Sequence, residues 1–172
     1  MPRSARTVAF AAFGAAAMLA AALAAAPAGA QSSANSSARM LAKYPVAKTY
    51  KGPNKPVDLK SHRRARRFRT RLREAAKERP NFAGRFIVTA WGCGTSCQMI
   101  AMIDASNGKV HFGPAAETGF VTRLNSRLLI VNPEEEIREA YDKLGLKRPS
   151  WLKTRYFLWA EAEGRLKPLT LP

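Results

Sequence analysis

The stretch RFIVTAWGCGTSCQMIAMID, residues 85–104, holds two apolar runs on either side of a loop that contains both cysteines of the chain. The runs 85–91 and 98–104 are rich in Ile, Val, Phe and Met, a composition typical of short β-strands. Gly92 and Gly94 allow the tight backbone turn that joins antiparallel neighbours. The stretch therefore predicts a β-hairpin. Because its first run is too continuously apolar for a sheet with one wet face, we expect other elements to cover both faces.

Further antiparallel strands are predicted after this hairpin. Short apolar runs bounded by turn residues predict strands at 109–112, 119–124, 127–131, 154–161 and 165–169. Asn107-Gly108 and Glu163-Gly164 favour tight turns, because asparagine and glycine tolerate the positive φ that such turns need. These runs extend the sheet by hairpins.

A basic helix is predicted before the sheet, from Ser61 to Arg79. Pro80 ends the pattern, because proline lacks the amide hydrogen that a helix needs. One narrow apolar stripe recurs at helical spacing, formed by Ala65, Phe68, Leu72, Ala75 and Ala76. We expect this stripe to dock on the sheet while arginines cover the other sides of the helix.

A second, short helix is predicted to start at Asn132-Pro133-Glu134-Glu135. Asn132 is a capping residue, Pro133 suits the first helical position, and Glu135 can reach back to the cap. Gly145 is placed to close the helix in left-handed geometry. We expect its buried face to consist of Ile137, Ala140, Tyr141 and Leu144.

Together these elements predict an α+β fold. Its main part is an antiparallel β-sheet of about five to seven short strands, arranged in hairpins. An N-terminal basic helix and one inserted short helix complete the fold.

The N-terminus is typical of a secretory signal peptide. Arg3 and Arg6 are followed by an uncharged, alanine-rich run and by the small residues Ala28-Gly29-Ala30. We expect cleavage after Ala30, which places the mature protein in the periplasm or outside the cell. A retained membrane anchor is the alternative, and the weak hydrophobicity of the run argues against it. The predicted organisation is a signal peptide at 1–30, a flexible or extended basic leader at 31–60, and one globular domain at 61–172 without a transmembrane segment.

Several of these segments resemble an uncharacterised family of small exported proteins of Gram-negative bacteria. The similarity covers roughly residues 68–131. It rests on Asn81-Phe82-Ala83-Gly84-Arg85-Phe86, Trp91-Gly92-Cys93-Gly94-Thr95-Ser96-Cys97, Ile103-Asp104, Gly108-Lys109-Val110 and Ser126-Arg127-Leu128-Leu129. The resemblance implies an exported, β-rich domain and brings no activity with it.

Cys93 and Cys97 are the two cysteines of the chain. In an exported protein, two nearby cysteines usually form a disulfide, so we expect one that fixes the hairpin turn. A redox-active pair is the alternative, but such sites use two intervening residues at the start of a helix, and here three residues separate the cysteines between two strands. Zinc binding would need His62 and His111, which are distant in sequence, so no metal is expected.

No catalytic set is recognisable in the sequence. A cysteine nucleophile needs a base, and His111 with Asp104 is the nearest pair. His111 alternates with apolar neighbours along its strand, so we expect its side chain to face solvent. Asp104 is explained as the first residue of a turn. We therefore predict no catalytic residue and no cofactor, and we retain Arg85 and Trp91 as candidate residues of a loop or pocket.

The positive charge of the chain is local. The formal net charge is +17, and between Arg39 and Arg79 fifteen Lys or Arg stand against three acidic residues, a local charge of +12. Guanidinium groups are forked donors that suit phosphates and carboxylates. The candidate anion-binding residues are Arg63, Arg64, Arg66, Arg67, Arg69, Arg71 and Arg73.

The leading hypothesis is a non-catalytic periplasmic or secreted protein that associates with anionic envelope polymer or a membrane surface through these arginines. Export argues against nucleic acid as the partner. One alternative is an inhibitor or interaction module that presents the Cys93–Cys97 loop to a protein partner, and another is an envelope hydrolase. A solvated cationic face without a ligand is the simplest alternative for the arginines themselves.

Overall fold

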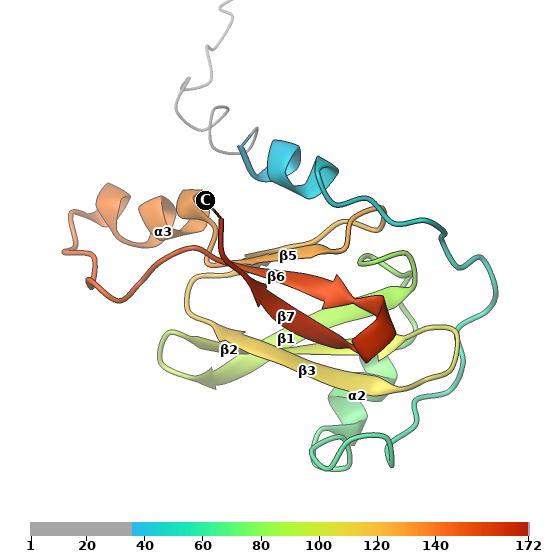
Figure 1. Ribbon diagram of the computed structural model, residues 1–172. Coiled ribbons are helices and arrows are strands. Elements are labelled where there is room, and N and C mark those ends of the chain that lie inside the picture. The colour runs from blue at the N-terminus through green and yellow to red at the C-terminus, as the bar shows by residue number, and fades with distance from the viewer. Residues whose placement is uncertain (1–35, 172) are drawn as a thin grey trace, which may run out of the picture.

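Two antiparallel β-sheets form the body of the protein (Figure 1). The computed structural model describes residues 36–171. The first sheet, in the order β1-β2-β3, consists of β1 (Phe86–Gly94), β2 (Cys97–Asp104) and β3 (Val110–Ala116). The second, in the order β4-β5-β6-β7, consists of β4 (Phe120–Val121), β5 (Leu128–Val131), β6 (Arg155–Ala160) and β7 (Arg165–Leu169). The predicted α+β, mainly antiparallel fold is confirmed.

The hairpin predicted from residues 85–104 supplies two of the three strands of the first sheet. β1 and β2 pair from Phe86, which lies opposite Asp104, to Trp91, which lies opposite Met99. The register shifts between Gly92 and Gly94, next to the turn. The last hairpin is also confirmed: β6 and β7 pair around η2 (Glu161–Glu163), which ends at Gly164 in left-handed geometry.

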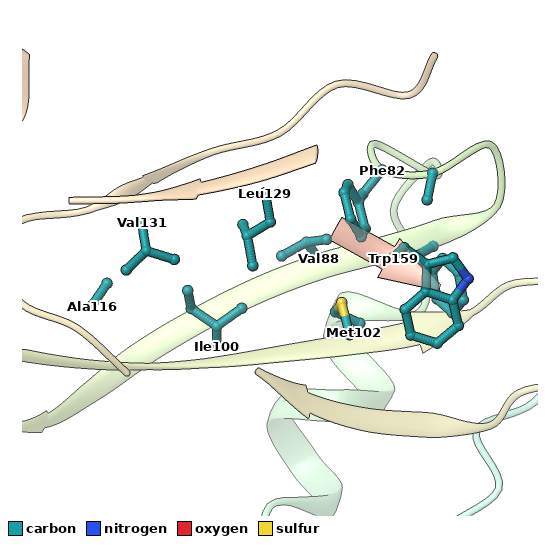
Figure 2. Packing of buried hydrophobic residues seen from close by; sticks show 10 residues of the cluster. Phe82, Val88, Ile100, Met102, Ala116, Leu129, Val131 and Trp159 are labelled. Atoms are coloured by element: carbon teal, nitrogen blue, oxygen red, sulfur yellow. The ribbon is translucent and has the colours of Figure 1, made fainter. Parts of the chain in front are cut away.

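The main core lies between the two sheets (Figure 2). Phe86 and Val88 of β1 belong to the same buried cluster as Leu129 and Val131 of β5. Trp159 of β6 packs on Phe86, with ring centroids 4.4 Å apart. Side chains alternate along a strand, so the intervening residues of β1 point to the other face of the first sheet. Both faces of this sheet are therefore covered, as its apolar sequence predicts.

The helix α2 (Arg69–Ala75) covers that outer face (Figure 1). The predicted stripe is confirmed, because Ala65, Leu72 and Ala75 are buried and Phe68 and Ala76 pack against the same cluster. The predicted length is wrong. Residues 63–68 form successive turns with bonds such as that from the N–H of Phe68 to the carbonyl of Ala65, and the α-helix spans seven residues.

Two features explain the short helix. Its first turn has no acidic residue and no side-chain cap, and the ring nitrogen of His62 accepts the N–H of Arg64, which competes with helical bonding. Beyond Ala75 the side chain of Asn54 donates to the carbonyls of Ala76 and Glu78, so a distant residue satisfies the end of the helix before Pro80 is reached.

A helical segment at residues 36–42 lies against the second sheet (Figure 1). Leu41 is buried with Leu128 and Ile130 of β5, and the buried hydroxyl of Ser126 donates to the carbonyl of Leu41. Residues 36–60, which the sequence analysis assigns to a leader, are therefore packed on the domain at several points. Apolar residues too sparse to suggest a core from sequence, such as Leu41 and Val46, provide these contacts. The predicted signal peptide and residues 31–35 lie outside the described residues.

The second predicted helix is α3 (Glu134–Ala140), followed by η1 (Asp142–Leu144). Gly145 closes η1 in left-handed geometry, as expected. The predicted cap is wrong, since Pro133 occupies the cap position and no side chain caps the helix. The predicted buried face is wrong as well: Ile137 is buried, whereas Leu144 is 69% exposed. Because α3 ends after two turns, the chain leaves the sheet before Leu144 can reach it.

Among the described residues, no helix is long and apolar enough to span a bilayer.

Candidate functional site

The seven candidate anion-binding arginines lie within one short segment and are called here the arginine surface: Arg63, Arg64, Arg66, Arg67, Arg69, Arg71 and Arg73. Their backbone is fixed from below, because Ala65 and Leu72 are fully buried under the outer face of the first sheet. The arginines lie outside the apolar stripe that faces the sheet. Six of the seven arginines are exposed, and Arg64 is half-buried.

Within residues 36–171, none of these seven arginines forms an ion pair with a carboxylate. Two of them rest on aromatic rings instead. The guanidinium carbon of Arg64 lies 4.2 Å from the ring centroid of Phe112, and that of Arg67 lies 5.7 Å from the centroid of Phe68. These contacts hold the two side chains over apolar surface and leave their donors available to an anion.

Acidic residues elsewhere are largely matched by bases. Arg148 bridges Glu134 and Asp142, Lys143 contacts Glu139, Arg155 contacts Glu117, and Glu163 holds both Arg165 and Lys167. Such exposed pairs contribute little to stability, but they cancel charge where they occur. The arginine surface differs from these regions, because its seven positive charges lie within residues 63–73 and have no carboxylate partner among the described residues.

His62 borders the arginine surface, and the positive charge of that surface affects its pKa. Burial lowers the pKa of His62 below its ordinary value, and the positive charges of Arg64 and Arg63 lower it further. The imidazole is therefore neutral near pH 7. An anion bound beside it would offset the two arginines and raise that pKa again.

A shallow groove of about 440 Å³ adjoins this surface. It lies between the edge strands β3 and β7 and is lined by His62, His111, Phe112, Phe157, Arg165 and Leu166, among others. The rings of His62 and Phe112 are 4.7 Å apart at their centroids. The groove could not be predicted from the sequence, because its residues come from five separate segments.

Arg85 and Trp91, the two candidate pocket residues, do not share a site. Trp91 is buried on the α2 side of the sheet, 4.9 Å from Phe68 between ring centroids, and its indole N–H has no hydrogen-bond partner within the described chain. Arg85 lies six residues earlier, about 20 Å away along an extended strand. It lines a cavity of about 400 Å³ together with Lys48, Arg127 and Glu161.

Arg85 is held by two carboxylates. Its Nε donates to Asp104 Oδ2 at 2.8 Å, and its Nη1 lies 2.7 Å from Glu161 Oε1. Burial alone would raise the pKa of Asp104, but bonds from Ser106 and Arg85 lower it below its ordinary value. Asp104 also accepts from the N–H and hydroxyl of Ser106, as expected of a turn residue. Asp104 is thus both a turn residue and the buried ion-pair partner of Arg85. The second role was not predicted from the sequence.

The disulfide between Cys93 and Cys97 is confirmed, with a Cα–Cα distance of 5.2 Å. It closes the exposed end of the β1–β2 hairpin, where Ser96 adopts φ of 48°. A Cβ added at Gly92 or Gly94 would have nothing within 4 Å, so the loop projects from the domain. The chain leaves the loop at Cys97, the first residue of β2.

The structure does not assemble the cysteines with Asp104 and His111. Cys97 begins β2 and Asp104 ends it, which separates them by about 23 Å. His111 is half-buried instead of facing solvent, because its ring packs edge-on against Trp159 at 5.1 Å and Phe86 at 5.8 Å. Burial lowers the pKa of His111, and the charge of Asp104 offsets part of that shift. Among residues 36–171, no group of three or more His, Cys, Asp or Glu is arranged to hold a metal ion.

No family model, curated protein or solved structure matches this chain.

Proposed function

We propose that this protein is a non-catalytic periplasmic or secreted protein that binds anionic components of the cell envelope through the arginine surface. The observation that carries the proposal is the set of seven neighbouring guanidinium groups without a carboxylate partner in the described chain. Clustered donors of this kind raise the local concentration of anions and suit phosphate and carboxylate groups.

The structure of the surface supports binding over a merely solvated face. Like charges four residues apart in a helix, such as Arg69 and Arg73 in α2, destabilise the helix slightly. The chain has acidic residues available, yet many of them pair with bases elsewhere, as Glu134 does with Arg148, Glu117 with Arg155 and Glu163 with Lys167. An external polyanion would supply the missing countercharge.

The test compares two variants with the same change in net charge. In the first, Arg63, Arg64, Arg66 and Arg67 are replaced by Gln. In the matched control, four exposed bases outside the arginine surface are replaced by Gln, namely Lys43, Arg123, Lys147 and Lys153. Binding to anionic phospholipid vesicles, polyphosphate and polygalacturonate is measured over a range of salt concentrations.

We expect the wild type to bind at least one of these probes with an affinity that falls steeply as salt is added. The arginine variant should lose about tenfold or more in affinity, equivalent to about 1.4 kcal/mol, while the control variant should lose much less. Equal losses of affinity in both variants would mean that binding depends on net charge and not on the arginine surface. Unchanged affinity in the arginine variant would refute the proposal.

A further inference from the structure

The groove between β3 and β7, called here the edge groove, is lined by aromatic and aliphatic side chains. Phe112 and His62 form one part of the lining, with their ring planes inclined at 44°. Phe157 and Leu166 form another part. A Cβ added at Gly113 would lie 3.6 Å from Leu166 Cδ1, an ordinary contact distance, so β3 and β7 approach each other at this point of the groove. The groove is thus largely apolar and open to solvent.

Its two borders are edge strands that do not favour an added peptide strand. β3 and β7 each end their sheet, so each has one unpaired edge. Pro114 in β3 and Pro168 in β7 both line the groove, and proline has no N–H to give to a neighbouring strand. Recognition in this groove therefore depends on side chains and not on backbone pairing.

The positive charge at the edge groove comes from its rim. None of the residues that line the groove is acidic, but the charge of Arg165 at its β7 border is offset by Glu163. Arg64 stands over Phe112, so one residue of the arginine surface reaches the rim of the groove. His62 belongs to the lining and lies between Ser61 and Arg63, which makes the groove continuous with the arginine surface.

We propose that the edge groove binds the sugar rings of an acidic polysaccharide whose carboxylates extend over the arginine surface. This inference rests on the proposed function and names its ligand class. A puckered sugar ring presents C–H groups that pack on the parts of Phe112 and His62 that line the groove and on its aliphatic walls. A flat nucleobase stacks on an open aromatic face, and Arg64 already covers a face of the Phe112 ring.

The test separates contacts to the sugar ring from contacts to charge. Two variants change the groove: His62→Ala, and Phe112→Leu, which keeps apolar bulk against Phe68 while removing the aromatic face. Trp151→Ala is the control, because it removes an aromatic ring that is 64% exposed and does not line the groove. Each protein is titrated with polygalacturonate, polyphosphate and oligo(dT), and a thermal melt checks its folding.

We expect each groove variant to lose about tenfold in affinity for polygalacturonate, equivalent to about 1.4 kcal/mol, and to keep its affinity for polyphosphate. Trp151→Ala should bind all probes as the wild type does. If Phe112→Leu melts early, His62→Ala alone decides the matter, because His62 lies near the surface and outside the buried core.

Equal losses for polygalacturonate and polyphosphate, or no loss for either, would overturn the inference. Tighter, groove-dependent binding of oligo(dT) would overturn it in favour of a nucleic acid. The proposed function has a separate outcome. If the groove variants weaken polygalacturonate binding while the four arginine replacements do not, the contact of the groove with the sugar rings stands, whereas the carboxylate contact with the arginine surface and the proposed function fail.

Discussion

Replacement of Arg85 by methionine should destabilise the protein substantially, because it leaves a carboxylate buried without its cation. The side chain of Asp104 is 4% exposed, and its Oδ2 receives Arg85 Nε at 2.8 Å. Breaking a buried ion pair from one side costs about 3–5 kcal/mol. Asp104 retains bonds from Ser106 and Asn107, so we expect the lower end of that range, about 3 kcal/mol. The contact with the exposed Glu161 adds less than about 1 kcal/mol.

The assay is urea unfolding at pH 7 of four proteins: wild type, Arg85→Met, Asp104→Asn and the double variant. Removing both charged partners removes the unpaired charge, so the double variant should be less destabilised than the sum of the single ones by about 1.5–3 kcal/mol. Arg127→Met is the matched control. Its Nε donates to the carbonyl of Pro45 at 3.3 Å and it has no carboxylate partner among the described residues, so we expect a loss of at most about 1 kcal/mol.

The effect should depend on pH in a defined direction. The folded pKa of Asp104 lies below its ordinary value of 3.8, so its charged form stabilises the fold. That contribution is complete above pH 3.8 and is lost as the pH falls through the folded pKa. The gap in unfolding free energy between wild type and Arg85→Met should therefore narrow in acid. Additive single-variant effects, or a gap that widens below pH 3.8, would refute the reasoning.

Further variants test the backbone and the disulfide. Gly108→Ala should lower the free energy of unfolding by about 3 kcal/mol or more, because its Cβ would lie 2.0 Å from the carbonyl oxygen of Pro56. Gly145→Ala is the control, because Gly145 has a similar positive φ but lies in open space; this variant should cost about 1–2 kcal/mol. Equal losses for the two variants in urea unfolding would contradict this reasoning. Replacing Cys93 and Cys97 by serine should cost about 2 kcal/mol in the same assay, since the closed loop is short, and should leave polyanion affinity unchanged. If the serine variant lost affinity for polyanions, the Cys93–Cys97 loop would have to belong to the binding site.

The strand pairs could be predicted because their signals are local. Gly92 and Gly94 stand beside the cysteine turn, and Gly164 stands where the last hairpin reverses. The alternation of side chains along β1 then assigns residues to the two faces. Each of these inferences needs only residues that are neighbours in sequence, and each agrees with the structure.

The helix ends could not be predicted because distant residues decide them. The side chain of Asn132 accepts the N–H groups of Glu117 and Thr118 and donates to the Glu117 carboxylate, so it is not available to cap α3. Asn54 in the same way holds the carbonyls that follow α2. In both places a tertiary contact overrides a good local motif.

The two cavities escaped sequence analysis for a related reason. Arg85 meets Asp104 from the end of β2 and Glu161 from the end of β6, and only the packing of the two sheets brings those ends together. Phe112 lies under Arg64 because Ser61 Oγ accepts the N–H of Val110 and thereby ties the start of the basic segment to β3. The local charge pattern identified the arginines but not the rings beside them.

The arginine surface also has a consequence for folding. Its like charges repel one another within α2 and the turns before it, and α2 has no side-chain cap to offset that repulsion. What fixes the segment is burial of Ala65, Leu72 and Ala75 and the tie from Ser61 to β3. A polyanion that binds the folded surface relieves the repulsion and stabilises the fold by mass action, while it finds no organised site on the unfolded chain. The proposed binding would therefore be coupled to local stability through the uncapped helix.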